Sequence, residues 1–563
     1  MYENRAALGY QDFEEVRSRH IFYVDKTDFI REWWEYADKV TLITRPRRFG
    51  KTLNASMVEC FFSNQYADRD ELFEGLSIWE HKEYRKLQGT IPVISLSFAN
   101  IRASDYNTME YKITEVIADL YNKNEFLLDG NLLNENEKEY YRGIKSGMEG
   151  KVAVGAVHQM SKFLGRRYDK KVIIILDEYD TPMQEAWISG YWNEAVSFFG
   201  GFFNASFKTN NYLDRGLITG ITRVARESMF SGMNNLEVIT TTSEKYEKAF
   251  GFTEEEVFLA LEEAGLGMEK QEVKRWYDGF TFGRQGAIYN PWSIVSFLAK
   301  KEYDTYWSNT GGNGLINSLI QTGSSDIKQT MEGLLRGESF ETAIDERIVF
   351  DQLNGSPNAV WSLLLATGYL KVLQRKQIGE RKRKVYTLTL TNMEVEIMFE
   401  DMVRGWFEGS VKVYYNEFIN ALLNDNVKKM NTFINKVALN TFSSFDSGKK
   451  PSGQAEPERF YHGFVLGMVV NLADTHKVRS NRESGYGRYD VMIEPNDKSG
   501  KAFIFEFKVL DPDEEGTLAD TLVSAHAQIK EKRYEAELIT EGFMPEQIRK
   551  YGFVFRGKEC LIG

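Results

Sequence analysis

The chain has few of the residues that build disulfide or zinc frameworks. Its 563 residues include two cysteines and six histidines, and Cys60 and Cys560 lie 500 positions apart in the sequence. These numbers exclude a disulfide scaffold, and the scattered histidines show no metal-ligand spacing. A reducing, cytoplasmic compartment fits this composition.

Long apolar runs are also missing. We find no stretch of about 18 or more apolar residues, and residues 1–5 have no signal-peptide core, so we expect no membrane span. The chain has 10 prolines and a 14% aromatic content, which argues against extended disorder. Its length predicts about three or four domains.

Positive charge is in deficit as well. Lysine and arginine total 70 against 82 aspartates and glutamates, which gives a net charge of −12. An acidic chain repels nucleic acid at long range. Binding of DNA or RNA therefore needs local basic patches, or metal ions held by carboxylates.

Residues 40–52 contain an apolar run, a short turn and the start of a helix. The Gly-Lys-Thr of residues 50–52 is typical of a phosphate-binding loop, in which backbone N–H groups face an anion, lysine reaches the outer phosphates and threonine ligates Mg²⁺. Arg45 stands where glycine is usual, so we expect a different turn, with Pro46 fixing its start. The expected ATP contacts are Arg47, Arg48, Phe49, Gly50, Lys51 and Thr52.

An acidic pair follows the apolar run of residues 172–176. Five consecutive apolar residues favour a strand buried on both faces of a parallel sheet, whose carboxyl end is where α/β sheets bind ligands. We expect Asp177 to hold the Mg²⁺ shell and Glu178 to orient or deprotonate the attacking water. The alternative is a buried strand followed by a solvated acidic turn.

A third expected strand covers residues 215–222 and ends before two arginines. Polar side chains at its tip can sense a γ-phosphate. Arg223 or Arg226 can reach the nucleotide, either in the same chain or from a neighbouring subunit. Ordinary surface arginines are an equally good interpretation.

The middle of the chain changes from helices to a hairpin near residue 370. Residues 369–373 and 385–390 alternate like paired strands, and the tip between them, residues 375–384, carries six basic residues and one acidic residue. A helix followed by such a hairpin predicts a winged-helix module with a basic wing. The charged tip is either a solvated turn or a phosphate contact.

A second group of charged residues occurs after a linker rich in Ser, Gly, Lys and Pro. Residues 488–494 and 501–509 are expected to be neighbouring strands, and alternation places Glu506 and Lys508 on one face with phenylalanines on the other. Asp490 completes the cluster. Paired carboxylates can hold one or two Mg²⁺ ions, with Mn²⁺ as a substitute, and lysine can orient water. A structural salt-bridge cluster is the alternative.

Two helices flank this cluster. In the preceding helix, Glu458 and His462 are one turn apart and can face the site. In the following helix, Gln528 is expected near one edge, together with Lys532 and Tyr534. The expected buried stripe of this helix is Leu518, Leu522, Ala525 and Ile529.

Together these motifs resemble a bacterial and archaeal family that joins an AAA-ATPase-like N-terminal region to a C-terminal PD-(D/E)XK nuclease-like domain. The resemblance covers nearly the whole chain and rests on residues 23–27, 45–52, 176–180, 289–293, and 490 with 506–508. It implies that Arg45 is normal at its position. It also implies metal binding by Asp490 and Glu506, catalysis by Lys508, and support from Glu458 and Gln528. The family in turn resembles signal-transducing NTPases with winged-helix tails.

We therefore expect an α/β multidomain protein. The predicted parts are a P-loop AAA-ATPase-like domain with a parallel sheet and flanking helices (1–250), a helical and winged-helix region (251–400), a helical connector and linker (401–450), and a restriction-endonuclease-like PD-(D/E)XK domain (451–563). The candidate catalytic residues are Glu178, Asp490, Glu506, Lys508, Gln528 and Glu458. The candidate residues for binding the nucleotide and the metal ions also include Asp177 and Arg223.

The predicted function is an ATP-binding, slowly hydrolysing NTPase that regulates a Mg²⁺-dependent nuclease acting on DNA or RNA, with homo-oligomerisation as a further expectation. Glu178 permits hydrolysis, and the loop without its usual glycine favours slow turnover. The alternative is a regulatory NTPase switch or scaffold whose nuclease-like domain docks partners and does not cut. A DNA-translocating motor is a weaker interpretation because we find no helicase-type motif series.

Overall fold

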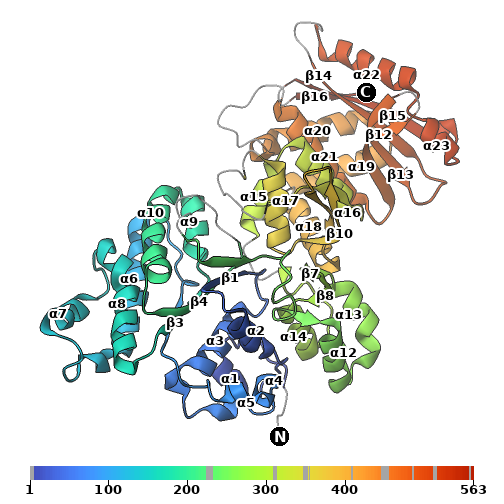
Figure 1. Cartoon of the computed structure of the whole chain (residues 1–563). Coiled ribbons are helices and arrows are strands. Elements are labelled where there is room, and N and C mark those ends of the chain that lie inside the picture. The colour runs from blue at the N-terminus through green and yellow to red at the C-terminus, as the bar shows by residue number, and fades with distance from the viewer. Residues whose placement is uncertain are drawn as a thin grey trace. The chain divides into compact units, whose positions relative to one another are not determined.

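The chain folds into two compact units (Figure 1). One unit comprises Met1–Trp307 and Thr342–Glu394, and the other Ser308–Glu341 and Val395–Gly563. A computed structural model describes residues 5–222, 233–308, 313–345, 353, 356–406, 410–445, 455–484, 487–510, 516–556 and 559–563.

A fully parallel sheet of five strands forms the centre of the first unit, as predicted. Every residue of its strands at 40–44 and 172–177 is buried, which explains why both are predominantly apolar. In order across the sheet, the strands are β2 (Val93–Ser97), β3 (Val172–Asp177), β4 (Leu213–Gly220), β1 (Val40–Thr44) and β5 (Leu236–Ile239). Because β4 lies between β1 and β3, the carboxyl ends of the three strands singled out in the sequence adjoin.

Helices flank this sheet, and α3, which follows the phosphate loop, packs against β3 and β4 while α8 packs against β3. The helices are α1 (Phe13–Ser18), α2 (Asp28–Tyr36), α3 (Lys51–Phe62), α4 (Ser77–Glu80), α5 (Lys82–Arg85), α6 (Tyr106–Lys123), α7 (Glu135–Gly143), α8 (Gly150–Tyr168), α9 (Thr181–Ser189) and α10 (Trp192–Phe203). Figure 1 shows α1 to α5 gathered in one group and α6 to α10 in another.

The rest of this unit is a small helical region with three antiparallel strand pairings, two of them short and the third a longer hairpin. Its helix α12 begins with a capping box between Thr253 and Glu256, as the sequence indicates. Buried aromatic residues, including Tyr277, Tyr289 and Phe297, fill its core. The elements are β6 (Phe252–Thr253), α12 (Glu254–Glu263), α13 (Lys270–Tyr277), β7 (Phe280–Phe282), β8 (Gln285–Tyr289), α14 (Pro291–Lys300), α17 (Pro357–Ala366), β10 (Leu370–Ile378) and β11 (Arg383–Leu390).

The second unit is built on a mixed five-stranded sheet. Its strands run in the order β12 (His476–Ser484), β13 (Gly487–Pro495), β14 (Ala502–Val509), β15 (Ile548–Arg556) and β16 (Glu559–Ile562), and only β14 and β15 pair in parallel. The other elements are α15 (Gly314–Gln321), α16 (Ser325–Leu335), α19 (Ser410–Leu423), α20 (Val427–Phe445), α21 (Ala455–Leu472), α22 (Leu518–Lys532) and α23 (Ala536–Thr540). Near the boundaries of the units lie β9 (Phe340–Thr342) and α18 (Met393–Gly405).

The predicted alternation along β14 is present. Phe505 and Phe507 stack against Phe553 with ring centroids 4.8 Å apart in both pairs. The intervening Ile504 faces the opposite side, where it joins a core that includes Ile529 of α22. Helix α16 also belongs to this unit, and Arg336, the residue that follows it, donates a hydrogen bond of 3.2 Å to the carbonyl oxygen of Val478 in β12.

Candidate nucleotide and nuclease sites

The phosphate loop turns at positions other than Arg45. Positive φ angles occur at Arg48 (64°) and Gly50 (78°), immediately before α3 begins at Lys51. The space into which a Cβ of Gly50 would project is open. The first N–H groups of α3 have no partner within the helix, so this open loop can receive an anion.

Lys51 is held inside the loop. Its side chain is 4% exposed, and Nζ donates to the carbonyl oxygens of Arg45 at 3.1 Å and Pro46 at 2.9 Å. Burial lowers the pKa of Lys51, and the charges of Glu178 and Asp177 act in the opposite direction. The lysine is therefore within electrostatic range of the acidic end of β3.

Asp177, the last residue of β3, is linked to helix α3 and strand β4. Its Oδ2 accepts a hydrogen bond of 2.7 Å from the Thr52 hydroxyl, and its Oδ1 accepts one from the Thr219 hydroxyl at the end of β4. Burial raises the pKa of Asp177, whereas these two hydrogen bonds lower it. Hydroxyl and carboxylate oxygens are the donors that Mg²⁺ prefers, so Thr52 and Asp177 fit a magnesium shell.

Glu178 adopts an uncommon backbone conformation, with φ at 52°. Its N–H donates to the Thr219 hydroxyl at 3.3 Å, and its Oε2 accepts from the Thr181 hydroxyl at 3.2 Å. A positive φ in a residue other than glycine costs free energy and often occurs at functional sites. Its half-buried carboxylate follows Asp177 directly in the sequence.

Sequence analysis gave no role to Asp180, which is 1% exposed. Its Oδ2 accepts from the N–H groups of Ile221 at 3.0 Å and Thr222 at 2.9 Å, and from the Thr222 hydroxyl at 3.0 Å. Asp180 thus fixes the backbone that leads out of β4 towards the predicted Arg223, which lies outside the described residues. The sequence feature that could have pointed to this role is the presence of an acidic residue three positions after Asp177.

Aromatic side chains of the helical region pack against the phosphate loop. Phe49 is fully buried against Phe280 and Phe282, at centroid distances of 4.8 Å and 5.3 Å. The buried Arg45 guanidinium lies 4.5 Å from the Phe282 centroid, and burial lowers the pKa of Arg45 to about 9. These two side chains therefore shape the loop by packing.

The other two loop arginines contact the same region. The Arg48 guanidinium lies 4.4 Å from the Trp292 ring centroid. The Arg47 carbonyl oxygen accepts from Asn290 Nδ2 at 3.2 Å and from Trp307 Nε1 at 3.0 Å. These contacts with Asn290, Trp292 and Trp307 hold the loop in place.

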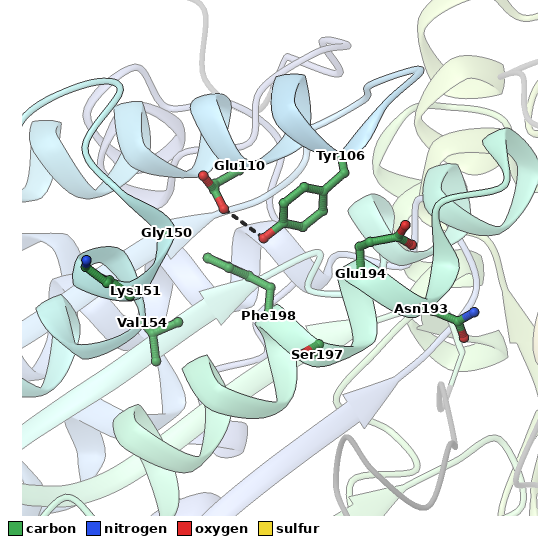
Figure 2. A pocket seen from close by; sticks show the side chains of 9 residues that line it. All are labelled: Tyr106, Glu110, Gly150, Lys151, Val154, Asn193, Glu194, Ser197 and Phe198. Carbon is green, nitrogen blue, oxygen red and sulfur yellow. Dashed lines mark hydrogen bonds between the residues drawn. The ribbon is translucent and has the colours of Figure 1, made fainter.

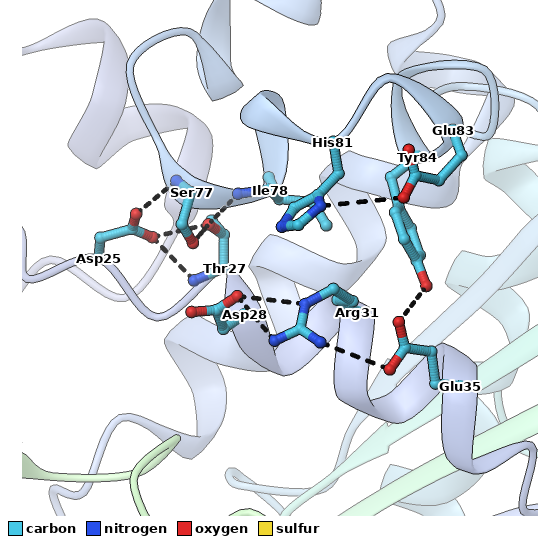
Figure 3. Close-up of polar contacts among 10 residues, drawn as sticks. All are labelled: Asp25, Thr27, Asp28, Arg31, Glu35, Ser77, Ile78, His81, Glu83 and Tyr84. Atoms are coloured by element: carbon cyan, nitrogen blue, oxygen red, sulfur yellow. Dashed lines mark hydrogen bonds and ion pairs between the residues drawn. The ribbon is translucent and has the colours of Figure 1, made fainter.

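The N-terminal motif of residues 23–27 has a structural role (Figure 3). Asp25 Oδ1 accepts from the N–H and hydroxyl of Thr27, and its Oδ2 accepts from the Ser77 N–H at 2.7 Å. Lys26, 9% exposed, pairs with Glu256 at 2.7 Å. The motif joins segments around the sheet.

In the second unit, three of the predicted residues are linked through Gln528. Lys508 Nζ donates to Gln528 Oε1 at 2.9 Å, and Gln528 Nε2 donates to Glu506 Oε1 and, at 3.0 Å, to the Tyr534 hydroxyl. Asp490 Oδ2 accepts from the backbone N–H of Phe507 at 2.6 Å. Residues from β13, β14 and α22 thus meet on one face of the sheet.

The cluster is short of positive charge. Burial, and after it the charge of the neighbouring Asp490, raise the pKa of Glu506 to about 8 against the opposing effects of Lys508 and Gln528. Glu506 Oε2 is buried and makes no hydrogen bond with any described residue. A buried carboxylate oxygen with a free lone pair beside a second carboxylate fits a divalent cation.

The acidic set is incomplete within the described residues, which contain no group of three His, Cys, Asp or Glu side chains placed to hold a metal. Asp490 and Glu506 supply two carboxylates. The backbone of Glu458 belongs to α21, but its side chain, like that of His462, lies outside the described part of the chain.

Helix α22 is rotated slightly from the predicted stripe. Ala525 and Ile529 are buried as expected, whereas Thr521 is buried where Leu518 and Leu522 were predicted, and both leucines are half-buried. The rotation directs Gln528 towards Lys508 and Glu506.

A separate open groove of about 680 Å³ lies in the first unit, between the starts of α6, α8 and α10 (Figure 2). Tyr106 donates to Glu110 at 2.7 Å beside it. None of the predicted nucleotide ligands lines this groove.

Comparisons with known proteins agree with this organisation. Residues 7–230 match the family model described as a predicted AAA-ATPase, and residues 456–563 match that of the PD-(D/E)XK nuclease superfamily. The chain therefore carries both domains, as predicted. A protein of Azotobacter chroococcum mcd 1, described as an uncharacterized protein in the vnfD 5′ region, is 24% identical over 577 residues, which cover 100% of this chain and 99% of that protein. Among the described helices, none combines the length and hydropathy that crossing a membrane requires.

Proposed function

We propose that the chain binds ATP and Mg²⁺ in its first unit and that the nucleotide state controls a metal-dependent nuclease in its second unit. The two family matches support an ATPase-like and a nuclease-like component. The control of one by the other, the metal dependence and the individual roles below are our proposal.

The observation that carries the nuclease half is the buried Oε2 of Glu506, which has no hydrogen-bond partner in the part of the chain that the structure describes. Asp490 and Glu506, together with Glu458 of α21, would hold Mg²⁺ or Mn²⁺. Such an ion makes hydroxide available and stabilises charge that develops at phosphorus. Lys508, whose ammonium Gln528 orients, positions the attacking water or offsets negative charge in the transition state.

The nucleotide half rests on Lys51, Thr52, Asp177 and Glu178. When ATP binds, Lys51 exchanges its two carbonyl partners for phosphate oxygens. The negative phosphate then neutralises the buried positive charge of the lysine. Thr52 and Asp177 would hold the Mg²⁺ shell, and Glu178 orients the water that attacks the γ-phosphate. We assign a further nucleotide contact to Arg223, and we expect slow turnover, which suits a switch.

We also propose the remaining assignments made from the sequence. The helix α17 with the hairpin β10–β11 corresponds to a winged-helix module, and the chain forms a homo-oligomer in the cytoplasm. The four predicted parts, 1–250, 251–400, 401–450 and 451–563, are retained as functional divisions of the chain.

The decisive experiment incubates the purified chain with Mg²⁺ or Mn²⁺ and a panel of DNA and RNA forms, with and without ATP. We expect metal-dependent cleavage that ATP modulates and that falls by at least about a hundredfold in Asp490→Ala, because a metal ligand is lost. Asp474→Ala, which removes an exposed carboxylate just before β12, is the matched control.

Equal cleavage by Asp490→Ala and the parent would remove the nuclease proposal. A metal-replete chain that cuts no nucleic acid but changes its assembly with ATP would instead support the scaffold alternative.

A further inference from the structure

The hairpin β10–β11 extends beyond the core of its unit. Residues 373–384 are exposed at every position, including Leu373 at 55% and Ile378 at 51%. In β10 the exposed residues are 373–378, which span roughly 20 Å at a rise of about 3.3 Å per residue, whereas in β11 only Arg383 and Lys384 are exposed and Tyr386 is already buried. An exposed strand end and tip of this kind need a function, because exposed strands are otherwise a liability.

Positive charge is concentrated on this ribbon. Residues 375–384 contain six basic residues and one acidic residue, so their net charge of +5 leaves −17 for the remainder of a chain whose total is −12. Four of the basic side chains make no hydrogen bond or ion pair with any described residue: Arg381, Lys382, Arg383 and Lys384. Their charges are therefore available to an external anion.

The register places basic residues on both faces of the ribbon. Arg375 pairs with Tyr386, and Gln377 with Lys384, so Arg375 and Lys384 share one face. The opposite face carries two further basic side chains, Lys376, which pairs with Val385, and Arg383, which pairs with Ile378. A ribbon with cations on both faces is suited to a site with phosphates on both sides.

The root of the hairpin is fixed against the phosphate loop. A Cβ at Gly368 would lie 3.0 Å from Pro46 Cγ, and the Tyr369 ring lies 5.3 Å from Trp307, which donates to the Arg47 carbonyl. Thr391 closes the base with a hydrogen bond of 2.7 Å to the Gly368 carbonyl. The ribbon is therefore preorganised at its root, which reduces the entropic cost of binding.

We infer that β10–β11 is a duplex-DNA-binding arm that lies in the major groove, where its two faces contact the phosphates of both strands. The major groove of B-DNA, about 12 Å wide, admits a two-stranded ribbon, whereas the deep, narrow major groove of duplex RNA does not. Phosphate contacts also explain how an acidic chain holds a polyanion. This inference names the polymer for the proposed nuclease and so rests on the proposed function.

The test measures binding of the full chain to labelled DNA without divalent metal, so that no cleavage occurs. Fluorescence anisotropy with a duplex of about 30 base pairs is followed from roughly 0.05 to 0.2 M salt, a range over which phosphate contacts weaken strongly. The variant replaces Arg381, Lys382, Arg383 and Lys384 with glutamine. The control replaces four exposed basic residues of the same unit, Arg102, Arg142, Lys171 and Lys208, with glutamine.

We expect the hairpin variant to bind at least about tenfold more weakly and to reduce the magnitude of the slope of log affinity against log salt by up to about 3.6, since each of four lost phosphate contacts contributes about 0.9. The control should change both quantities little. Equal losses in the two variants, or none in the hairpin variant, would overturn the inference, as would tighter binding of duplex RNA or single-stranded DNA.

Failure of the two proposals is distinguishable. A parent chain that cleaves with Mg²⁺ while the hairpin variant binds duplex DNA normally refutes the arm and leaves the nuclease. A parent that binds duplex DNA through the hairpin but never cleaves supports the arm and refutes the nuclease.

Discussion

The Lys508 ammonium lies 2.9 Å from the side-chain oxygen of Gln528, a residue 20 positions later in the chain. The amide nitrogen of the same glutamine donates to Glu506, so one side chain orients both a cation and a carboxylate. Groups that orient metal ligands and catalytic residues contribute to rate without touching the substrate. Gln528 is therefore a positioning residue in the proposed nuclease.

Replacement of this glutamine tests that relationship. We expect Gln528→Ala to lower the cleavage rate about 10–100-fold, because Lys508 and Glu506 lose their common support. Half-buried Gln528 fills little of the core, so the melting temperature should change by only a few degrees. Lys530→Ala, an exposed change on the same helix, is the control. Parental rates in Gln528→Ala would show that the bridge is dispensable.

Loss of the loop lysine tests the nucleotide half. We expect Lys51→Ala to abolish ATP binding in a calorimetric titration, because the ammonium that would meet the outer phosphates is gone. The second unit should remain folded, since Lys51 hydrogen-bonds only within its own loop among the described contacts. Lys171→Ala, at an exposed lysine before β3, should bind ATP normally. Unchanged affinity in Lys51→Ala would refute the assignment.

Removal of the Thr219 hydroxyl distinguishes a role in ATP hydrolysis from a role in ATP binding. Thr219→Val keeps the shape of the side chain but removes the donor to Asp177 Oδ1. We expect ATP turnover to fall about tenfold with affinity nearly unchanged, and the free energy of unfolding to fall by about 1–3 kcal/mol because a buried acceptor loses its partner. Thr209→Val, at an exposed threonine, is the control. Equal turnover in the two variants would contradict the role.

Much of the framework was predictable because hydrophobic patterns are local. The apolar runs at 40–44 and 172–176 predicted buried parallel strands, and the alternation at 502–509 predicted which face carries Glu506. Charged residues at the ends or on one face of such strands stand out because burial without a partner is costly.

Features that depend on distant contacts were not predictable. No local pattern shows that Asp180 binds the backbone after β4, 41 to 42 positions away, or that residues 308–341 cluster with the second unit. The rotation of α22 that buries Thr521 rather than Leu518 follows from packing on the sheet. The hydrophobic pattern alone leaves such a rotation undetermined.

Arg45 provides a contrast with ordinary phosphate loops. Arg45→Gly restores the usual residue, yet we expect it to lower the free energy of unfolding by about 2–4 kcal/mol, because a large buried side chain and its ring contacts are lost. ATP affinity should not improve. Urea unfolding of this variant beside Arg102→Gly, an exposed loop change, measures the difference. A stability equal to that of the parent would show that the Phe282 contact contributes nothing.

Asp425 makes the stability of the second unit dependent on pH. Burial alone would raise its pKa, but hydrogen bonds from Tyr551, Arg549 and Lys501 outweigh burial and lower the pKa to about 2. In the unfolded chain the pKa of an aspartate is about 3.9. The unfolded state therefore binds the proton more readily, and the contribution of this carboxylate is complete above about pH 5 and lost as the pH falls towards 2.

Urea unfolding of the second unit at a series of pH values checks this dependence. At pH 7 we expect Asp425→Asn to lower the free energy of unfolding by about 2 kcal/mol, and the difference from the parent should shrink steadily below about pH 4. Asp474→Asn, which removes an exposed carboxylate, should show neither effect. If the difference in the free energy of unfolding between Asp425→Asn and the parent stayed constant down to about pH 2, the ionised carboxylate would not be what stabilises the contacts of Asp425.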